Sequence, residues 1–439
     1  MKKALFSMAL PAILALACGS GHEKPNVVLI LIDTLRADHL GCYGYGRDTS
    51  PVIDSLAAVG SRFRRVQSQS PWTLPAMTTI MTGLSHCSHR AGMWDGVYYG
   101  IDPSLPYLPG LLGEDGYETA AFFNVLFMSS DFGFHRGFDL FDCESSIEEI
   151  TARNARETVD SVVSWLETRE DKAPLFLAVH FYDPHLTYDP EPPFDTLFTN
   201  RSYGGSFGSA WGSKDDMLLV NSGDMMLDSS DRCNLIDLYD GEIAYTDHQI
   251  GRLLRCLRRV GLAGNTLVII TADHGEEFLD HDGVGHGHTL YQELLNVPLV
   301  VSGPGIPVGY EEDALVGQID ILPSVLVYCG VELPPVLEGR NIISTAISDR
   351  VYPSSLILSS GGRVAVRRDD TKLHWVSYTD AAFQYDLAVD PGERLPSLSL
   401  DSALVREAQD YWAVPPEGEP NPVSLEEVEL KALRNLGYF

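Results

Sequence analysis

Three continuous apolar runs constrain the fold of this chain more than any other feature. They are Asn26–Ile32 (NVVLILI), Leu175–Phe181 (LFLAVHF) and Thr266–Thr271 (TLVIIT). Strands without polar alternation are typical of sheets that are covered on both faces, as parallel sheets are. The segment Val297–Ser302 has the same character and predicts a fourth strand.

Helical patterns separate these runs. Thr151–Glu170 places valine and leucine side chains on one face of a helix, and Asn234–Val260 repeats apolar residues at helical spacing. Strands that alternate with helices predict an α/β domain with a mostly parallel central sheet flanked by helices, which we assign to residues 26–345. Short strand-like segments joined by turns follow, so residues 346–439 are predicted to form a small C-terminal antiparallel sheet subdomain and a tail.

The beginning of the chain has the pattern of an export signal. Two lysines precede an apolar stretch that is too short to span a bilayer comfortably, so we assign residues 1–17 to a signal peptide and 18–25 to an exported tether. Ala15-Leu16-Ala17 before Cys18 resembles a bacterial lipoprotein signal. This predicts a periplasmic or outer-membrane-associated lipoprotein whose membrane contact is a lipid on Cys18. Ordinary cleavage after Ala17 would instead give a secreted protein.

The charge balance excludes one class of partner. The 439 residues include 61 acidic and 31 basic side chains, which give a formal net charge of −30. A nucleic-acid partner requires a basic face, so we expect no nucleic-acid binding. An anionic substrate would also need local positive charge, and a metal ion is best suited to provide it. Some of the six cysteines after Cys18 could pair in an oxidising compartment.

Acidic and imidazole side chains follow three of the predicted strands. These strands run into Asp33, into Asp183-Pro184-His185 and into Asp273-His274. Ligands of open α/β sheets bind beyond the carboxyl ends of the strands, and carboxylates with imidazole suit a divalent cation. Each aspartate alone could instead cap the following helix. Their occurrence at three strand ends favours a metal site.

A hydroxyl residue begins another predicted helix. Pro75 occupies a first-turn position, and Thr73 lies just before it. Free backbone N–H groups at a helix N-terminus favour an anion, so Thr73 beside a metal ion is a candidate nucleophile. A simple helix cap is the alternative interpretation.

Chemistry on an anionic substrate requires positive charge near the oxygens of the reacting group. Besides a metal ion, the candidate groups are Arg36, His185, His286 and His288. A protonated His185 could give its proton to the leaving group. Arg36 could instead form a local ion pair with Asp38. The segment 280–288 (DHDGVGHGH) could contact substrate, form a polar surface loop or hold a second metal ion.

Motifs along nearly all of the exported chain resemble the sulfatase branch of the alkaline phosphatase superfamily. They lie at 26–45, at 73–83 in the place of the nucleophile motif, and at 137–139, 183–185, 271–277, 296–299, 320–323, 385–393 and 433–438. Each motif is short, and their joint order and spacing carry the resemblance. It implies an alkaline-phosphatase-like fold and a metal-dependent ester hydrolase.

Several positions depart from the family's pattern. Sulfatases convert a Cys or Ser of the nucleophile motif to formylglycine, whereas this chain has Thr73. The motif's Arg is Met77, and the usual second Asp after the first strand is Thr34. The set that remains resembles branches with an unmodified Thr nucleophile, and it consists of Asp33, Thr73, Asp273 and His274.

The resemblance therefore implies a hydrolase of sulfate or phosphate esters that uses this set to hold one divalent ion. Oxygen-rich ligation favours Ca²⁺, whereas a second site bearing histidine would favour Zn²⁺ or Mn²⁺. The substrate would be an anionic ester of a glycan, an aryl group or a lipid headgroup. A phospho-headgroup transferase and a non-catalytic binding protein on the same scaffold are the alternatives.

Overall fold

The computed structural model describes residues 23–146, 151–170, 172–199, 203–205, 214–343, 347, 349–358 and 361–425. The predicted signal peptide, Cys18 and the motif at 433–438 lie outside these residues. Within the part that is described, no helix is both long enough and apolar enough to cross a membrane.

The predicted apolar runs form the centre of a large sheet. Its order over the described residues is β14-β2-β13-β10-β1-β9-β5-β6. The strands are β1 (Asn26–Ile32), β2 (Ser61–Gln67), β5 (Glu118–Phe123), β6 (Leu140–Cys143), β9 (Leu175–Phe181), β10 (Thr266–Ala272), β13 (Leu299–Ser302) and β14 (Tyr310–Gly317). Among these strands β13 alone runs against the others. The predicted mostly parallel α/β sheet is therefore confirmed.

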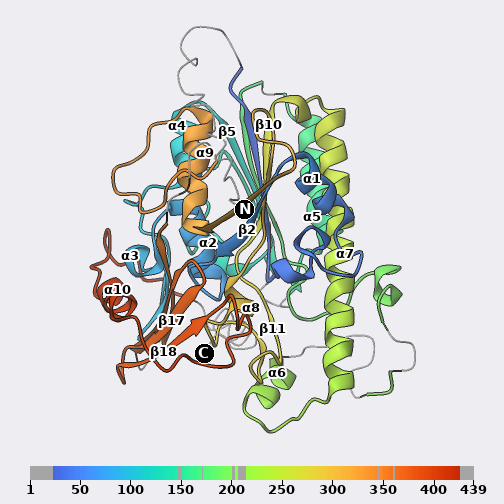
Figure 1. Cartoon of the computed structure of the whole chain (residues 1–439). Coiled ribbons are helices and arrows are strands. Elements are labelled where there is room, and N and C mark those ends of the chain that lie inside the picture. The colour runs from blue at the N-terminus through green and yellow to red at the C-terminus, as the bar shows by residue number, and fades with distance from the viewer. Residues whose placement is uncertain are drawn as a thin grey trace, which may run out of the picture.

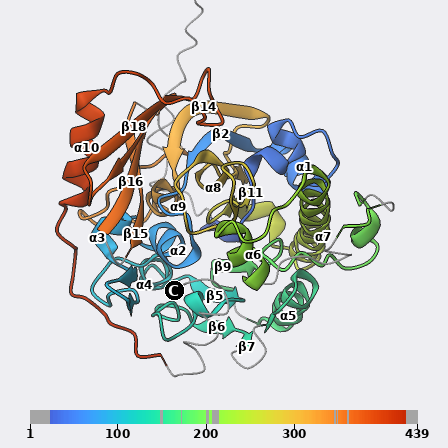
Figure 2. The same cartoon turned by 90° about the horizontal axis from the view of Figure 1, so that it is seen from below.

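Helices cover both faces of this sheet. One face carries α1 (Pro51–Val59), α5 (Ala155–Thr168) and α7 (Ser229–Arg259), and the other carries α2 (Thr73–Thr82), α4 (Leu108–Glu114) and α9 (Ile321–Cys329) (Figures 1 and 2). Because both faces are covered, every residue of β1, β9 and β10 is buried. The shorter helices are α3 (His86–His89), α6 (Lys214–Asn221), α8 (Gln292–Leu295) and α10 (Ser402–Trp412).

A second, antiparallel sheet follows the large one in the chain. Its strands are β15 (Val351–Leu358), β16 (Gly361–Arg368), β17 (Thr371–Val376) and β18 (Ala381–Asp386), and they pair in that order. Helix α10 packs against β16 and β17. The predicted small C-terminal sheet is thus present, while the domain boundary at residue 345 stays a prediction. Three two-stranded pairs complete the described strands: β3 (Gly92–Trp94) with β4 (Val97–Tyr99), β7 (Ser145–Ser146) with β8 (Thr151–Ala152), and β11 (Glu277–Phe278) with β12 (Val284–Gly285).

Helix boundaries differ from the sequence expectation where side chains cap the backbone. Helix α5 begins at Ala155 rather than Thr151, because Asn154 and Glu157 form a reciprocal capping box. Helix α7 begins at Ser229, before the predicted Asn234, because Asp228 caps it in the same way with Asp231. The six cysteines of the described residues are all free thiols, so none of the possible disulfides is formed.

Candidate active site

Asp33 and Asp273 meet because their strands are neighbours. Strand β1 pairs in parallel with β10, and Ile32 lies beside Ala272. The next residue of each strand is an aspartate, so both carboxylates lie at the carboxyl edge of the sheet. Oδ1 of Asp273 accepts hydrogen bonds from the backbone N–H groups of Thr34 (3.2 Å) and His274 (2.8 Å), which fix its carboxylate.

Three of the four oxygens of these two carboxylates lack hydrogen bonds among the described residues. Both side chains are fully buried, and among the described residues neither oxygen of Asp33 nor Oδ2 of Asp273 has a hydrogen bond. Burial, and next the charge of Asp273, raise the pKa of Asp33. Paired carboxylates without a cation are costly in the interior of a protein. The arrangement therefore calls for a positive charge between them.

His274 completes a donor set that fits a divalent cation. Its Nε2 lies 3.7 Å from Oδ1 of Asp33 and 3.3 Å from Oδ2 of Asp273. Donors that bind one ion at about 2.0–2.6 Å lie at such separations from one another. Within the described residues Asp33, Asp273 and His274 are the one group of three or more such donors close enough to share an ion. The second metal ion considered from segment 280–288 therefore has no matching donor group there.

Thr73 faces the same donor set from the start of α2. Its side chain is buried, and its Oγ1 lies 3.4 Å from Nε2 of His274. Nδ1 of His274 lies 2.9 Å from the carbonyl oxygen of Gly275, which can only accept, so Nδ1 holds the proton and Nε2 presents a lone pair. Trp72, not Thr73, is the cap residue of α2, and no side chain caps this helix. The hydroxyl is thus directed at the site rather than at its own helix.

Two further predicted histidines join His274. The ring of His286 lies 4.5 Å from that of His274 and 4.9 Å from that of His185, measured between centroids. Nδ1 of His286 contacts Oε1 of Glu276 at 2.9 Å, and Nδ1 of His185 donates to the carbonyl oxygen of Leu186 at 2.7 Å. Burial lowers the pKa of His185 to about 3. Its imidazole is therefore neutral near pH 7 in the protein alone, so the protonated form considered from the sequence is not the resting one.

Arg36 is a predicted source of positive charge for the site, but in the structure its charge is paired with two carboxylates. Its guanidinium forms ion pairs of 2.8 Å with both Asp38 and Asp280, and it also donates to the backbone oxygen of Glu276 at 3.0 Å. The alternative interpretation, a local ion pair with Asp38, is therefore the arrangement found. Two carboxylates neutralise Arg36, so its role is to hold the segment that follows Asp273.

Asp183 also has a structural role. Its Oδ2 accepts a hydrogen bond of 2.6 Å from the backbone N–H of Ala155, at the start of α5. Burial raises its pKa to about 7. The strand end of β9 therefore supplies His185 to the site, while its aspartate faces the neighbouring helix.

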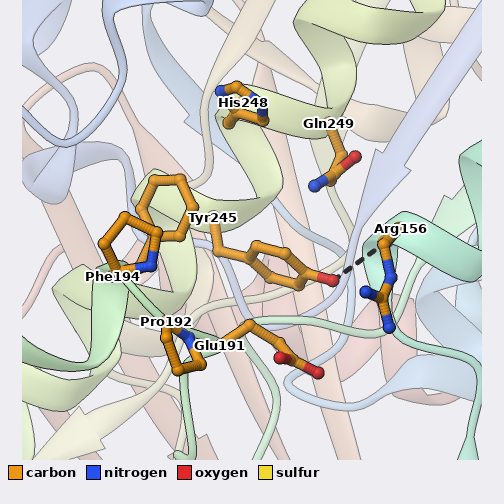
Figure 3. Close-up of a pocket in the computed structure, with 8 residues that line it drawn as sticks. Arg156, Glu191, Pro192, Phe194, Tyr245, His248 and Gln249 are labelled. Carbon is orange, nitrogen blue, oxygen red and sulfur yellow. Dashed lines mark hydrogen bonds between the residues drawn. The ribbon is translucent and has the colours of Figure 1, made fainter.

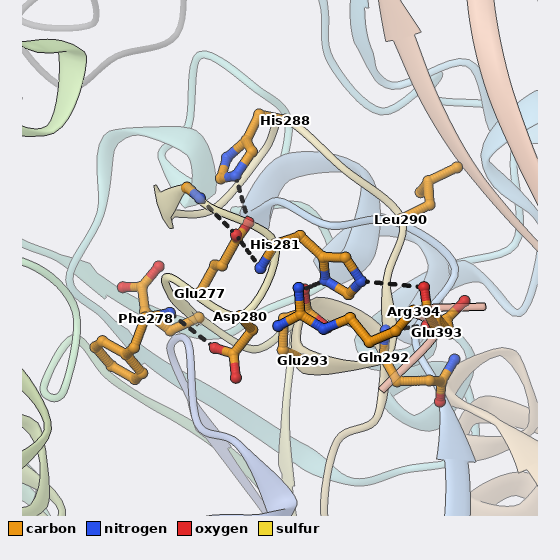
Figure 4. A network of polar contacts seen from close by, with 12 residues as sticks. Glu277, Phe278, Asp280, His281, His288, Leu290, Gln292, Glu293, Glu393 and Arg394 are labelled. Atoms are coloured by element: carbon orange, nitrogen blue, oxygen red, sulfur yellow. Dashed lines mark hydrogen bonds and ion pairs between the residues drawn. The ribbon is translucent and has the colours of Figure 1, made fainter. Parts of the chain in front are cut away.

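The segment 276–293 is held from within by Glu277 (Figure 4). Oε1 of Glu277 accepts the backbone N–H groups of His281 and Gly283, both at 2.8 Å, and Oε2 contacts Nε2 of His288 at 2.7 Å. Burial lowers the pKa of His288, but the hydrogen bond and charge of Glu277 outweigh it and raise this pKa overall. His288 and His286 are thus each paired with a carboxylate, and of the two it is His286 that lies against His274.

The C-terminal sheet holds the same segment from outside. Glu393 accepts the backbone N–H of Gln292 at 2.7 Å and Nε2 of His374 at 2.7 Å, and it pairs with Lys372 at 3.0 Å. Lys372 donates to the backbone oxygen of Leu290 at 2.5 Å. We call Lys372, His374 and Glu393 the C-terminal clamp. Lys372 and Glu393 are buried and His374 is partly buried, and the three side chains fix the chain that carries His286.

Sequence reasoning missed two features of this region. His180 lies within an apolar strand, and a single polar residue in such a run was the available signal. The partners Lys372 and Glu393 are far apart in the chain, and no local pattern shows that they pair.

A pocket of about 400 Å³ lies elsewhere, between the start of α5, the segment 191–194 and α7 (Figure 3). Tyr245 lines it and accepts a hydrogen bond of 3.2 Å from the backbone N–H of Arg156. None of the predicted site residues lines this pocket, so the chemistry is assigned to the strand ends.

A central α/β sheet with two carboxylates, an imidazole and a hydroxyl at its carboxyl edge defines an alkaline-phosphatase-like protein. Residues 25–331 match the family described as Sulfatase. The chain therefore belongs to the sulfatase family, whose members are ester hydrolases.

Relatives agree with this assignment. The chain is 24% identical to an arylsulfatase of Clostridium perfringens, with 88% of this chain and 92% of that protein covered. It is 23% identical to an N-acetylglucosamine-6-O-sulfatase of Bacteroides thetaiotaomicron, with 90% and 87% covered.

Solved structures share the fold. One, in complex with its substrate D-glucosamine-2-N,6-O-disulfate, has a TM-score of 0.72 at 18% identity and covers 89% of this chain and 97% of its own. A phosphonate monoester hydrolase of Agrobacterium radiobacter has a TM-score of 0.71 at 21% identity and covers 88% and 94%.

Proposed function

We propose that this chain hydrolyses a singly charged ester through Thr73 itself, with one divalent cation held by Asp33, Asp273 and His274. A phosphodiester or phosphonate monoester is the favoured substrate, and a sulfate monoester is the second candidate. The observation that carries the proposal is the position of the Thr73 hydroxyl, 3.4 Å from Nε2 of His274 and at the N-terminus of α2.

The cation, when bound, supplies positive charge that stabilises the charge developing on the transferred group. The chain's own residues do the rest. Thr73 Oγ1 bonds to phosphorus or sulfur as the ester oxygen departs, and His286, with its Nδ1 at Glu276, accepts the Thr73 proton. His185, in ring contact with His286, relays a proton to the departing oxygen. Water then cleaves the Thr73 ester, and Thr73 regains its proton.

The charges of the site favour a monoanion. Arg36 is neutralised by Asp38 and Asp280, and Lys372 by Glu393. The cation faces two carboxylates, so a dianionic phosphate monoester would meet little net attraction. A singly charged ester meets less repulsion from the surrounding carboxylates.

The residue type at position 73 favours phosphorus over sulfur. A formylglycine hydrate can release its ester without a second attack on sulfur, whereas a Thr ester must be cleaved by water. A glycan sulfate is named for one relative, the N-acetylglucosamine-6-O-sulfatase, and is the bound substrate of one solved structure of the same fold. Sulfate esters therefore stay in the test.

The test compares the full exported chain with Thr73→Ala, Thr73→Ser and Thr82→Ala. The substrates are bis(para-nitrophenyl) phosphate, para-nitrophenyl phenylphosphonate, para-nitrophenyl sulfate and para-nitrophenyl phosphate, each with Ca²⁺, Mn²⁺ or Zn²⁺. Thr73→Ala should lower kcat by about a thousandfold or more, and Thr73→Ser by about tenfold or less. Thr82→Ala is the matched control, because this threonine lies on the same helix and its hydroxyl bonds to its own helix backbone.

Three results would overturn the proposal. Full turnover by Thr73→Ala would remove Thr73 from the chemistry. Absence of turnover with any substrate, together with unchanged ligand affinity in Thr73→Ala, would support a binding protein. Turnover that requires an alcohol acceptor would instead identify a transferase.

A further inference from the structure

His180 is a buried histidine whose position packing alone does not explain. It lies in β9, in register with Leu31 of β1, and so on the same face of the sheet as Asp33 two residues further on. Its side chain is fully buried, and among the described residues neither ring nitrogen has a hydrogen bond. A buried polar group without a partner destabilises the folded protein. The other residues of β9 are apolar, and a leucine would fill this place without that cost.

The ring of His180 faces Oδ2 of Asp33, which is a proposed metal ligand. Nε2 lies 3.5 Å from Oδ2 of Asp33, while Oδ1 of the same carboxylate lies 3.7 Å from Nε2 of His274. The two oxygens of Asp33 thus face two different histidines. The separation of 3.5 Å is longer than a normal hydrogen bond, and closing it takes about 0.5 Å of movement.

We propose that His180 is the positioning residue of Asp33, and this inference rests on the cation site of the proposed function. Its Nε2–H donates to Oδ2 of Asp33 when the cation is bound, which leaves Oδ1 toward the ion. Histidine and carboxylate partners of this kind commonly fix the orientation of metal ligands.

The orientation of Asp33 by His180 matters more because the residue after Asp33 is a threonine rather than a second carboxylate. Thr34 stands directly after Asp33, and its Oγ1 is buried without a hydrogen bond among the described residues. Three side chains, rather than a larger carboxylate set, are grouped for the ion. Fewer ligands make the affinity depend more strongly on how each one is oriented.

The test is the affinity for the cation, measured by isothermal titration calorimetry with Ca²⁺ and Mn²⁺ on full-length variants. His180→Leu should weaken binding by about 10–100-fold. His180→Gln retains an N–H donor of similar reach and should recover part of that loss. His86→Leu is the matched control, because His86 is also fully buried and its Nε2 also lacks a hydrogen bond, but it lies beside Ser355 of the C-terminal sheet. It should bind the cation like the wild type.

Each outcome separates this inference from the proposed function. Wild-type affinity in a folded His180→Leu variant, checked by circular dichroism, would overturn the role of His180 and leave the cation site intact. Equal losses in His180→Leu and His86→Leu would show a general effect of buried substitutions and would also overturn it. A wild-type chain that binds neither cation would overturn the cation site of the proposed function, and the role of His180 with it.

Discussion

At the carboxyl ends of β1 and β10, Asp33 and Asp273 bring two negative charges together inside the protein. Burial and the charge of Asp273 raise the pKa of Asp33, which shows that the pair opposes ionisation. Groups with this property are costly for stability and useful for holding a cation. At the scale of single residues, the two carboxylates therefore favour cation binding and at the same time lower the stability of the cation-free protein.

Asp273→Asn should separate these two effects. In the presence of a chelator, the variant should be more stable than the wild type. Its free energy of unfolding should be higher by about 1 kcal/mol or more, because one of two repelling carboxylates is removed. Saturating Ca²⁺ should stabilise the wild type by about 2.7 kcal/mol at a hundred times its Kd, and the variant hardly at all. Urea unfolding with and without Ca²⁺ measures both effects. Equal Ca²⁺ stabilisation of the two proteins would contradict the ligand role of Asp273.

At the scale of elements, the C-terminal clamp joins the C-terminal sheet to the segment 290–292, about eighty or more residues earlier in the chain. Lys372 and His374 lie on β17, and Glu393 follows β18. Lys372 bonds to the backbone of Leu290, and Glu393 bonds to the backbone of Gln292. His374 and Lys372 both bond to Glu393. Burial raises the pKa of Glu393, but Lys372 and His374 outweigh it and lower this pKa to about 2. The carboxylate thus stays charged and anchors the chain beside His286.

Lys372→Met should lower the unfolding free energy by about 3–5 kcal/mol at pH 7, because Glu393 is left buried without its cation. A carboxylate with a lowered pKa stabilises the fold above its ordinary pKa of 4.5, and this stabilisation is lost as the pH falls toward about 2. The difference between wild type and variant should therefore narrow below pH 4.5 in urea unfolding series. Arg368→Met, which breaks a partly exposed pair between the end of β16 and Asp401 at the N-terminus of α10, should change stability by about 1 kcal/mol or less. A pH-independent difference would contradict the clamp.

At the scale of the whole molecule, the sequence predicted the elements whose signal is local. Continuous apolar runs marked β1, β9 and β10, and the aspartates after β1 and β10 marked the candidate metal site. The contacts of Arg36 with Asp280 and of Lys372 with Glu393 join residues far apart in the chain, so no local pattern showed them. The neutrality of His185 also depends on burial, which the sequence does not display. Export and a lipid on Cys18 stay predictions.

The proposed function depends on Thr73 acting as the nucleophile. A covalent ester on its hydroxyl would be direct evidence for this role. We would mix the full chain and the required cation with bis(para-nitrophenyl) phosphate, quench in acid within one turnover, and sequence the peptide that contains Thr73 by mass spectrometry. We expect Thr73 to be unmodified before mixing and to carry one transferred phosphoryl ester after it, and we expect no such ester in Thr73→Ala. Turnover with the adduct on another residue would show that Thr73 is not the nucleophile. Turnover with no adduct, under conditions that trap the intermediate, would show the same.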